Sequence, residues 1–325
     1  MDFSQIMLLN DNDKMQYLLN ASDQLEFWEK MEIIGSFKSE DLQIACLTNH
    51  NISEGLDVVS IISSMKSSKL KVECLTNPNI EITPSDRTSI VLSIQDDNMK
   101  ISCLTDPNIV LDFSNKEEYA TSLGDIVVSL KSDEAKLRCI LNPDIALTPY
   151  ELMRTIISTQ SEQLKINCLD NQKFRLEPTN KAVIIASLQD DEKKLRYIQD
   201  ESIGFNDKDR LLILCSLEDE KKFEKFGLLP DDSYKQSLGL PPNMTIGVEL
   251  EAEGTYAEHI RLVGKILNGW EVKGDGTLEN GVEITSPILH STENDMFSLA
   301  TVSNIMQKLD LKTTQNCGRT HSLWS

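Results

Sequence analysis

A recurring pattern of apolar and polar positions runs through most of this 325-residue chain. Two or three bulky aliphatic residues are followed by a serine, as at residues 90–93 and 126–129. The aligned serines are Ser36, Ser64, Ser93, Ser129, Ser158, Ser187 and Ser216. They are 28, 29, 36, 29, 29 and 29 residues apart, and one seven-residue insertion near residues 114–120 explains the long step. A repeat of this length predicts units that stack on their neighbours to bury a shared core.

A second column follows ten residues after each serine and is mostly cysteine. It consists of Cys46, Cys74, Cys103, Cys139 and Cys168, and continues with Tyr197 and Phe226. Thiolate ligands of zinc are usually separated by two to four residues, whereas here they are one repeat apart, so we expect buried core residues. Seven cysteines are an odd number, which predicts reduced thiols and a cytoplasmic location.

Local signals favour two short helices in each unit. Thr148-Pro149-Tyr150-Glu151 has the form of a capping box with proline at the first helical position, and Thr83-Pro84 repeats part of it. Prolines such as Pro78 are typical of the point where a second helix ends. We therefore predict an all-α helical-repeat solenoid over residues 1–229, with units of 28–29 residues.

A different architecture stays open at this point. Leu70, Val72 and Cys74 alternate with polar residues, and residues 164–168 do the same. Alternation with period two indicates a strand, and a strand once per unit would give a leucine-rich-repeat horseshoe. The helix-forming composition of residues 190–198 favours the helical alternative.

After residue 229 the pattern changes. Residues 230–243 are polar and contain paired prolines, which predicts a linker. Residues 244–325 then predict an α+β domain, beginning with a strand at 245–253 that would place Glu249 and Glu251 on one face. Such a face can hold a divalent cation, but this segment taken alone is more typical of a solvated sheet surface. A helix at 256–268 and a hairpin through the glycine-rich turn at 274–281 follow.

Three ordered motifs in this part resemble the opening of the amidoligase family. They are Ile246-Gly-Val-Glu-Leu-Glu251, Gly269-Trp-Glu-Val-Lys-Gly-Asp-Gly-Thr-Leu278 and Gly281-Val-Glu-Ile-Thr-Ser-Pro-Ile-Leu289. The family is a branch of the carboxylate–amine ligases with the glutamine synthetase and glutamate–cysteine ligase fold. The resemblance implies a partial antiparallel-sheet domain of glutamine-synthetase-like type.

The resemblance also implies a chemistry. Such ligases phosphorylate a carboxylate substrate with ATP, and an amine substrate then displaces phosphate to form an amide or isopeptide bond. Glu249 and Glu251 are similar to the family's metal-binding pair, and Asp275 and Glu283 to the acids that complete the shell. Magnesium or manganese ions held there would neutralise charge on the transferred phosphoryl group. No catalytic side chain is singled out.

The family's downstream Cys-Gly-x-His-x-His motif is only partly present. Cys317-Gly318 begins it, Thr320 stands where the first histidine should be, and His321 is one place off. We include His321 as a candidate metal ligand. The early end of the chain leads us to expect a truncated ligase, and whether it is active or inactive stays open at this point.

The net charge of the chain limits the classes of partner that it can bind. With 32 Lys+Arg against 52 Asp+Glu the net charge is −20, so we expect no nucleic-acid partner. No apolar run approaches the about 18 residues that cross a bilayer, and we expect no membrane association. The alternative to a ligase is a non-catalytic helical-repeat scaffold that binds a protein or peptide partner on its repeat surface.

Overall fold

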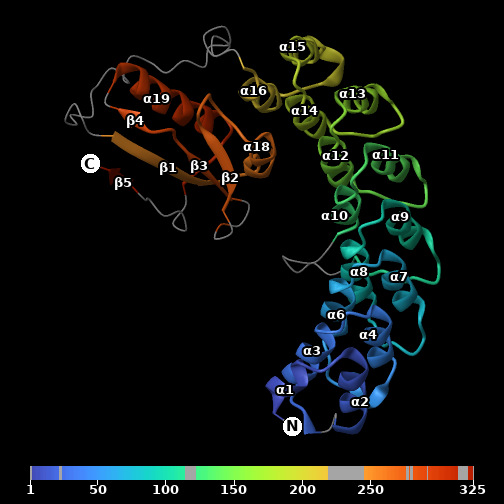
Figure 1. Ribbon diagram of the computed structural model, residues 1–325. Helices are drawn as coiled ribbons and strands as arrows, with labels where there is room; N and C mark the ends of the chain where they lie inside the picture. Colours follow the sequence, from blue (N-terminus) through green and yellow to red (C-terminus); the bar gives the residue numbers. More distant parts are fainter. Residues whose placement is uncertain are drawn as a thin grey trace. The chain divides into compact units, whose positions relative to one another are not determined.

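The chain is mostly helical and carries one small antiparallel sheet (Figure 1). The computed structural model describes residues 2–21, 24–113, 122–218, 245–275, 278, 281–290, 292–313 and the backbone of 321–324. It forms two compact units, Met1–Thr159 and Gln160–Ser325. The predicted linker at 230–243 and the insertion at 114–120 lie outside the described residues.

The first unit is built from short helices. They are α1 (Phe3–Met7), α2 (Asp11–Ala21), α3 (Phe27–Gly35), α4 (Glu40–Leu47), α5 (His50–Ser53), α6 (Val58–Ser64), α7 (Ser68–Thr76), α8 (Pro84–Ser93), α9 (Asp97–Thr105), α10 (Leu123–Val128), α11 (Asp133–Leu141) and α12 (Pro149–Ile157). From α6 onward the helices form two rows, with α6, α8, α10 and α12 in one and α7, α9 and α11 in the other (Figure 1).

The predicted capping signals are confirmed. The Thr148 hydroxyl accepts a hydrogen bond from the Glu151 amide at 3.2 Å, and the Glu151 carboxylate accepts one from the Thr148 amide at 2.9 Å. Thr83 and Asp86 form the same reciprocal pair at the start of α8. Two otherwise unpaired backbone donors are thus satisfied at each helix start.

The strand alternative is wrong at both segments that suggested it. Residues 70–74 lie inside α7, and residues 164–168 lie inside α13 (Glu162–Asp170). The physical reason is that one polar member of each alternation is itself buried: Lys71 is 2% exposed and Lys165 is 8% exposed. The alternation therefore did not separate a buried face from a solvated one.

The buried lysines form a recurring contact. In each case a lysine of one helix pair donates a hydrogen bond from its ammonium group to a serine. This serine ends the first helix of the following pair and usually lies 22 residues later in the sequence. The pairs are Lys14–Ser36, Lys71–Ser93, Lys100–Ser129, Lys136–Ser158, Lys165–Ser187 and Lys194–Ser216, at 2.7–3.3 Å. The carboxyl end of a helix carries unpaired carbonyls and partial negative charge, which a cation there stabilises.

The cysteine column is confirmed as core. Cys46, Cys74, Cys103, Cys139 and Cys168 are all buried, free thiols. Burial raises the pKa of Cys46 to about 12, and burial is the largest reason that the pKa of each of the other four is raised to about 11. These thiols fill space between helices and stay protonated.

The second unit combines helices with the sheet. Its helical part contains α13, α14 (Pro178–Ala186), α15 (Asp191–Gln199) and α16 (Asp207–Cys215). The sheet has the order β2 (Glu271–Gly274), β3 (Gly281–Thr285), β1 (Thr245–Glu253), β4 (Leu289–His290), and β5 (His321–Trp324) also pairs with β1. Helices α18 (Ala257–Val263) and α19 (Glu293–Lys308) pack with it (Figure 1).

Helix α18 packs against α14 and α16, which joins the sheet to the last helices. Asp209 is fully buried at this contact and accepts a hydrogen bond from the Tyr256 hydroxyl at 3.0 Å. The Asn206 amide donates to the same hydroxyl at 3.1 Å. Because a buried carboxylate needs donors, this network fixes how α16 and α18 meet.

Candidate functional site

The sheet brings two of the predicted ligands together. Strands β1 and β3 are antiparallel, and Glu251 lies directly opposite Glu283. Opposite residues share one face of a sheet, with β-carbons about 4.5–5.5 Å apart. Glu249 lies on the same face, one row along the strand and opposite Thr285. The predicted strand at 245–253 and the hairpin of β2 and β3 are both confirmed.

This face carries the carboxylates of Glu251 and Glu283 beside other polar side chains. Lys273 of β2 is opposite Glu283, yet its ammonium group contacts the Glu271 carboxylate at 3.2 Å. The Thr285 hydroxyl donates to one Glu283 oxygen at 3.1 Å. Like charges directly opposite each other destabilise a sheet, so a bound cation would relieve the repulsion between Glu251 and Glu283.

The other two predicted ligands, Asp275 and His321, do not lie in the paired rows of β1 and β3. Asp275 follows the end of β2 and is half-buried. The backbone of His321 pairs with Val248, and its side chain lies outside the described residues. Among the side chains that the structure describes, no group of three or more His, Cys, Asp and Glu could hold a metal ion.

The positively charged side chain of Arg261 lies against the hairpin. The guanidinium group of Arg261 covers Gly274, the residue before Asp275, so closely that a β-carbon at Gly274 would come within 2.9 Å of it. Arg261 also forms an ion pair with Glu258 on its own helix. The proximity of Arg261 to the hairpin depends on how α18 packs on β2, which the sequence does not specify.

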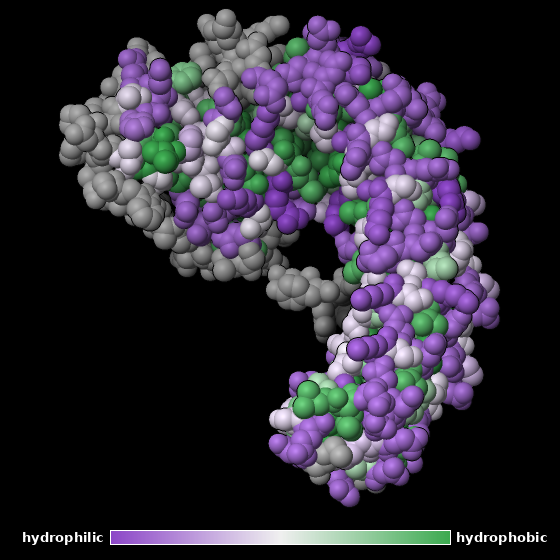
Figure 2. Space-filling view, viewed as in Figure 1, coloured by the Kyte–Doolittle hydropathy of each residue, from purple (hydrophilic) through white to green (hydrophobic). Residues whose placement is uncertain are grey.

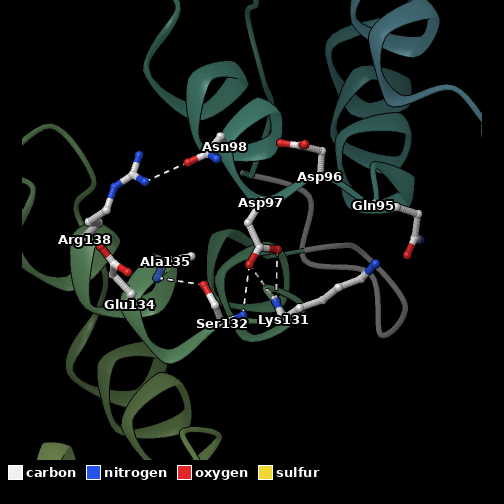
Figure 3. Close-up of a pocket in the computed structure, with 9 residues that line it drawn as sticks. All are labelled: Gln95, Asp96, Asp97, Asn98, Lys131, Ser132, Glu134, Ala135 and Arg138. Atoms are coloured by element: carbon white, nitrogen blue, oxygen red, sulfur yellow. Dashed lines mark hydrogen bonds between the residues drawn. The ribbon is translucent and has the colours of Figure 1, made fainter.

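The first unit contains a polar pocket of about 580 Å³ between the starts of α9 and α11 (Figure 3). Its groups bond to one another. The Asp97 carboxylate accepts hydrogen bonds from the Lys131 and Ser132 amides at 2.9–3.1 Å, and Arg138 donates to Asn98 at 2.7 Å. Burial raises the pKa of Asp97, but these amide bonds and the Lys100 charge outweigh burial and lower it overall.

A second pocket of about 360 Å³ lies between α13 and α15. Tyr197 takes the place of the cysteine column there, and its hydroxyl donates to Asp170 at 3.0 Å. Burial and this bond raise the pKa of Tyr197 to about 12.

Comparisons with protein-family models, with curated proteins and with solved structures found no match for this chain. In the described part of the chain, no helix has both the length and the apolar character to span a membrane.

The lysines that join successive helix pairs were missed in the sequence. The available signal was a third column: Lys71, Lys100, Lys136 and Lys165 each lie three residues before a cysteine of the second column. Because lysine is rarely buried, the sequence favours solvent-exposed side chains at these positions. Gln43 takes this position one repeat before Lys71 and donates instead to the Ile34 carbonyl at 3.1 Å.

Proposed function

We propose that the sheet of the second unit is the opening part of an ATP- and magnesium- or manganese-dependent carboxylate–amine ligase domain of the glutamine-synthetase-like type. The proposal rests on the three motifs that resemble the amidoligase family. The single structural observation that supports it best is the direct pairing of Glu251 with Glu283.

The carboxylate pair suits a shared rather than an all-protein metal site. Magnesium is commonly bound by one or two carboxylates together with the phosphates of a substrate. Glu251 and Glu283 supply two carboxylates on one face, with Glu249 in the next row. A divalent ion bound there would offset the negative charge of ATP phosphates. Asp275 and His321 remain candidates for completing the shell.

An activity assay tests this proposal. The full chain is incubated with MnCl₂, ATP, a mixture of carboxylates such as glutamate, and an amine donor such as ammonium, and ADP release is followed. We expect amine-dependent ADP release that Glu251→Gln and Glu283→Gln abolish. Glu271→Gln is the matched control, because Glu271 lies on the same sheet face and is already paired with Lys273. ADP release that persists in both variants would reject the assignment.

A scaffold function is the second candidate, and the recurring lysine–serine bonds favour it. Each bond joins neighbouring helix pairs, which is how a helical-repeat solenoid would be held in register. The free, buried thiols of the described chain support a reducing compartment such as the cytoplasm. If manganese and ATP leave the melting temperature unchanged and no ADP is released, the scaffold is the function that remains.

A further inference from the structure

The amino-terminal end of the first unit exposes large apolar side chains. Leu8 is 87% exposed, Phe27 is 51% exposed and Trp28 is 55% exposed. The rings of Phe3 and Trp28 meet edge to face with centroids 5.3 Å apart, which holds the start of α1 against the start of α3. We call Phe3, Phe27 and Trp28 the amino-terminal patch. Figure 2 shows hydrophobic side chains gathered at this end among hydrophilic ones.

Phe27 and Trp28 lie outside the core, against which Phe3 packs while partly buried. The buried face of α3 consists of Ile33 and Ile34 with the stem of Lys30, whereas Phe27 and Trp28 lie on its first turn and point outward. Apolar groups that stay exposed together on a folded protein usually mark an interaction site. Tryptophan and phenylalanine are also enriched at the centres of protein interfaces.

The charge around the patch selects the kind of partner. Within the described part of residues 2–38, Lys14 is 5% exposed and Lys30 is 9% exposed, and Lys38 is the one exposed lysine. The Lys14 ammonium group is engaged with the Ser36 hydroxyl at 2.8 Å. The other exposed charges there are four acids, which outnumber Lys38: Asp2, Asp13, Glu26 and Glu32. The rim is therefore negative in a chain of net charge −20.

A second copy of the chain is disfavoured by this rim, because two such patches would bring like charges together. A partner with the opposite charge gains from both the apolar centre and the acidic rim. We propose that the amino-terminal patch docks an amphipathic helical segment of a partner protein, with lysines or arginines flanking its apolar residues. The inference rests on the scaffold proposal above and names the partner class for it.

A peptide titration tests the inference. The probes are two fluorescein-labelled peptides of about 18 residues with the same leucine spacing, one with lysine and one with glutamate at the polar positions. Anisotropy is measured against the full chain without metal or ATP. We expect the leucine–lysine peptide to bind at least about tenfold more tightly than the leucine–glutamate peptide, and to lose at least about tenfold in affinity with Trp28→Ala. Trp28→Phe should retain most of the affinity.

The control separates the patch from general attraction to an acidic protein. Leu141→Ala removes another exposed leucine of the first unit, at 56% exposure, and should leave binding unchanged. Equal loss in Leu141→Ala and Trp28→Ala, equal binding of the two peptides, or no binding would each overturn the proposal. So would a dimer in sedimentation that Trp28→Ala dissociates, because a second copy would then be the occupant. None of these results bears on the ADP assay or on the lysine–serine contacts.

Discussion

Lys71 joins the helices before and after its own: its ammonium group donates to the Ser63 carbonyl at 2.7 Å and to the Ser93 carbonyl at 3.0 Å. Ser63 lies at the end of α6 and Ser93 at the end of α8. A lysine in the second row thus neutralises the carboxyl ends of two neighbouring helices in the first row. Burial lowers the pKa of Lys71, against the opposing charge of Glu40, so the bonds compete with a desolvation cost.

Removing this ammonium group should destabilise the first unit. Lys71→Met keeps the apolar stem but leaves buried carbonyls without a donor, so we expect a loss of about 2 kcal/mol in the free energy of unfolding. Urea unfolding followed by circular dichroism measures it. Lys69→Met on the same helix, where the side chain is 75% exposed, should change stability little. Equal effects of the two variants would mean that the Lys71 bonds contribute nothing specific.

The contact between α16 and α18 should depend on one hydroxyl. Tyr256→Phe removes the donor to the fully buried Asp209 carboxylate, and we expect a loss of about 2 kcal/mol. Amide hydrogen exchange should then quicken in α18 before it does in α8. The exposed Tyr150 provides the comparison, because Tyr150→Phe should alter neither quantity. Unchanged exchange in α18 would show that apolar packing alone holds the contact.

Acid should weaken the second unit through His259. Burial lowers the pKa of His259, although a backbone hydrogen bond at Thr255 and the charges of Glu258 and Asp209 act in the opposite direction. Because the folded-state pKa lies below the unfolded value of about 6.5, this stability is complete above that pH and is lost as pH falls below it. His259→Gln should flatten the decrease in melting temperature between about pH 6.5 and 5. His290→Gln, at an exposed position, should not.

The buried thiols of the cysteine column should be inert in the native state. With pKa values raised to about 11 or 12, they carry almost no thiolate at pH 8, and the thiolate is the reactive form. In a Cys317→Ser background, so that only cysteines of the described chain report, a chromogenic disulfide reagent should react slowly until urea unfolds the protein. Fast labelling of the folded chain would contradict the assigned core.

Local patterns predicted much of the fold. The serine and cysteine columns located the helix pairs, the Thr148 capping box located α12, and the alternation after Met244 located β1. These features depend on residues within one or two turns. The lysine–serine bonds escaped prediction although their column was visible, because the pattern gives no sign that an ammonium group is buried.

Only part of the candidate site could be predicted from the sequence. Alternation placed Glu249 and Glu251 on one face, but the pairing of Glu251 with Glu283 depends on the register of β1 and β3, which no local pattern specifies. Helix α19 was not predicted at all. The contact between Asn206 and Tyr256, 50 residues apart, could likewise not be read from either segment alone.

The most direct test of the central claim is a titration of Mn²⁺ followed by electron paramagnetic resonance, with and without ATP. We predict that the chain retains Mn²⁺ more tightly with ATP present, and that the Glu251→Gln/Glu283→Gln double variant weakens retention by at least about tenfold. Glu271→Gln should bind like the wild type. Retention by the double variant equal to that of the wild type would contradict the claim that this carboxylate pair holds a cation.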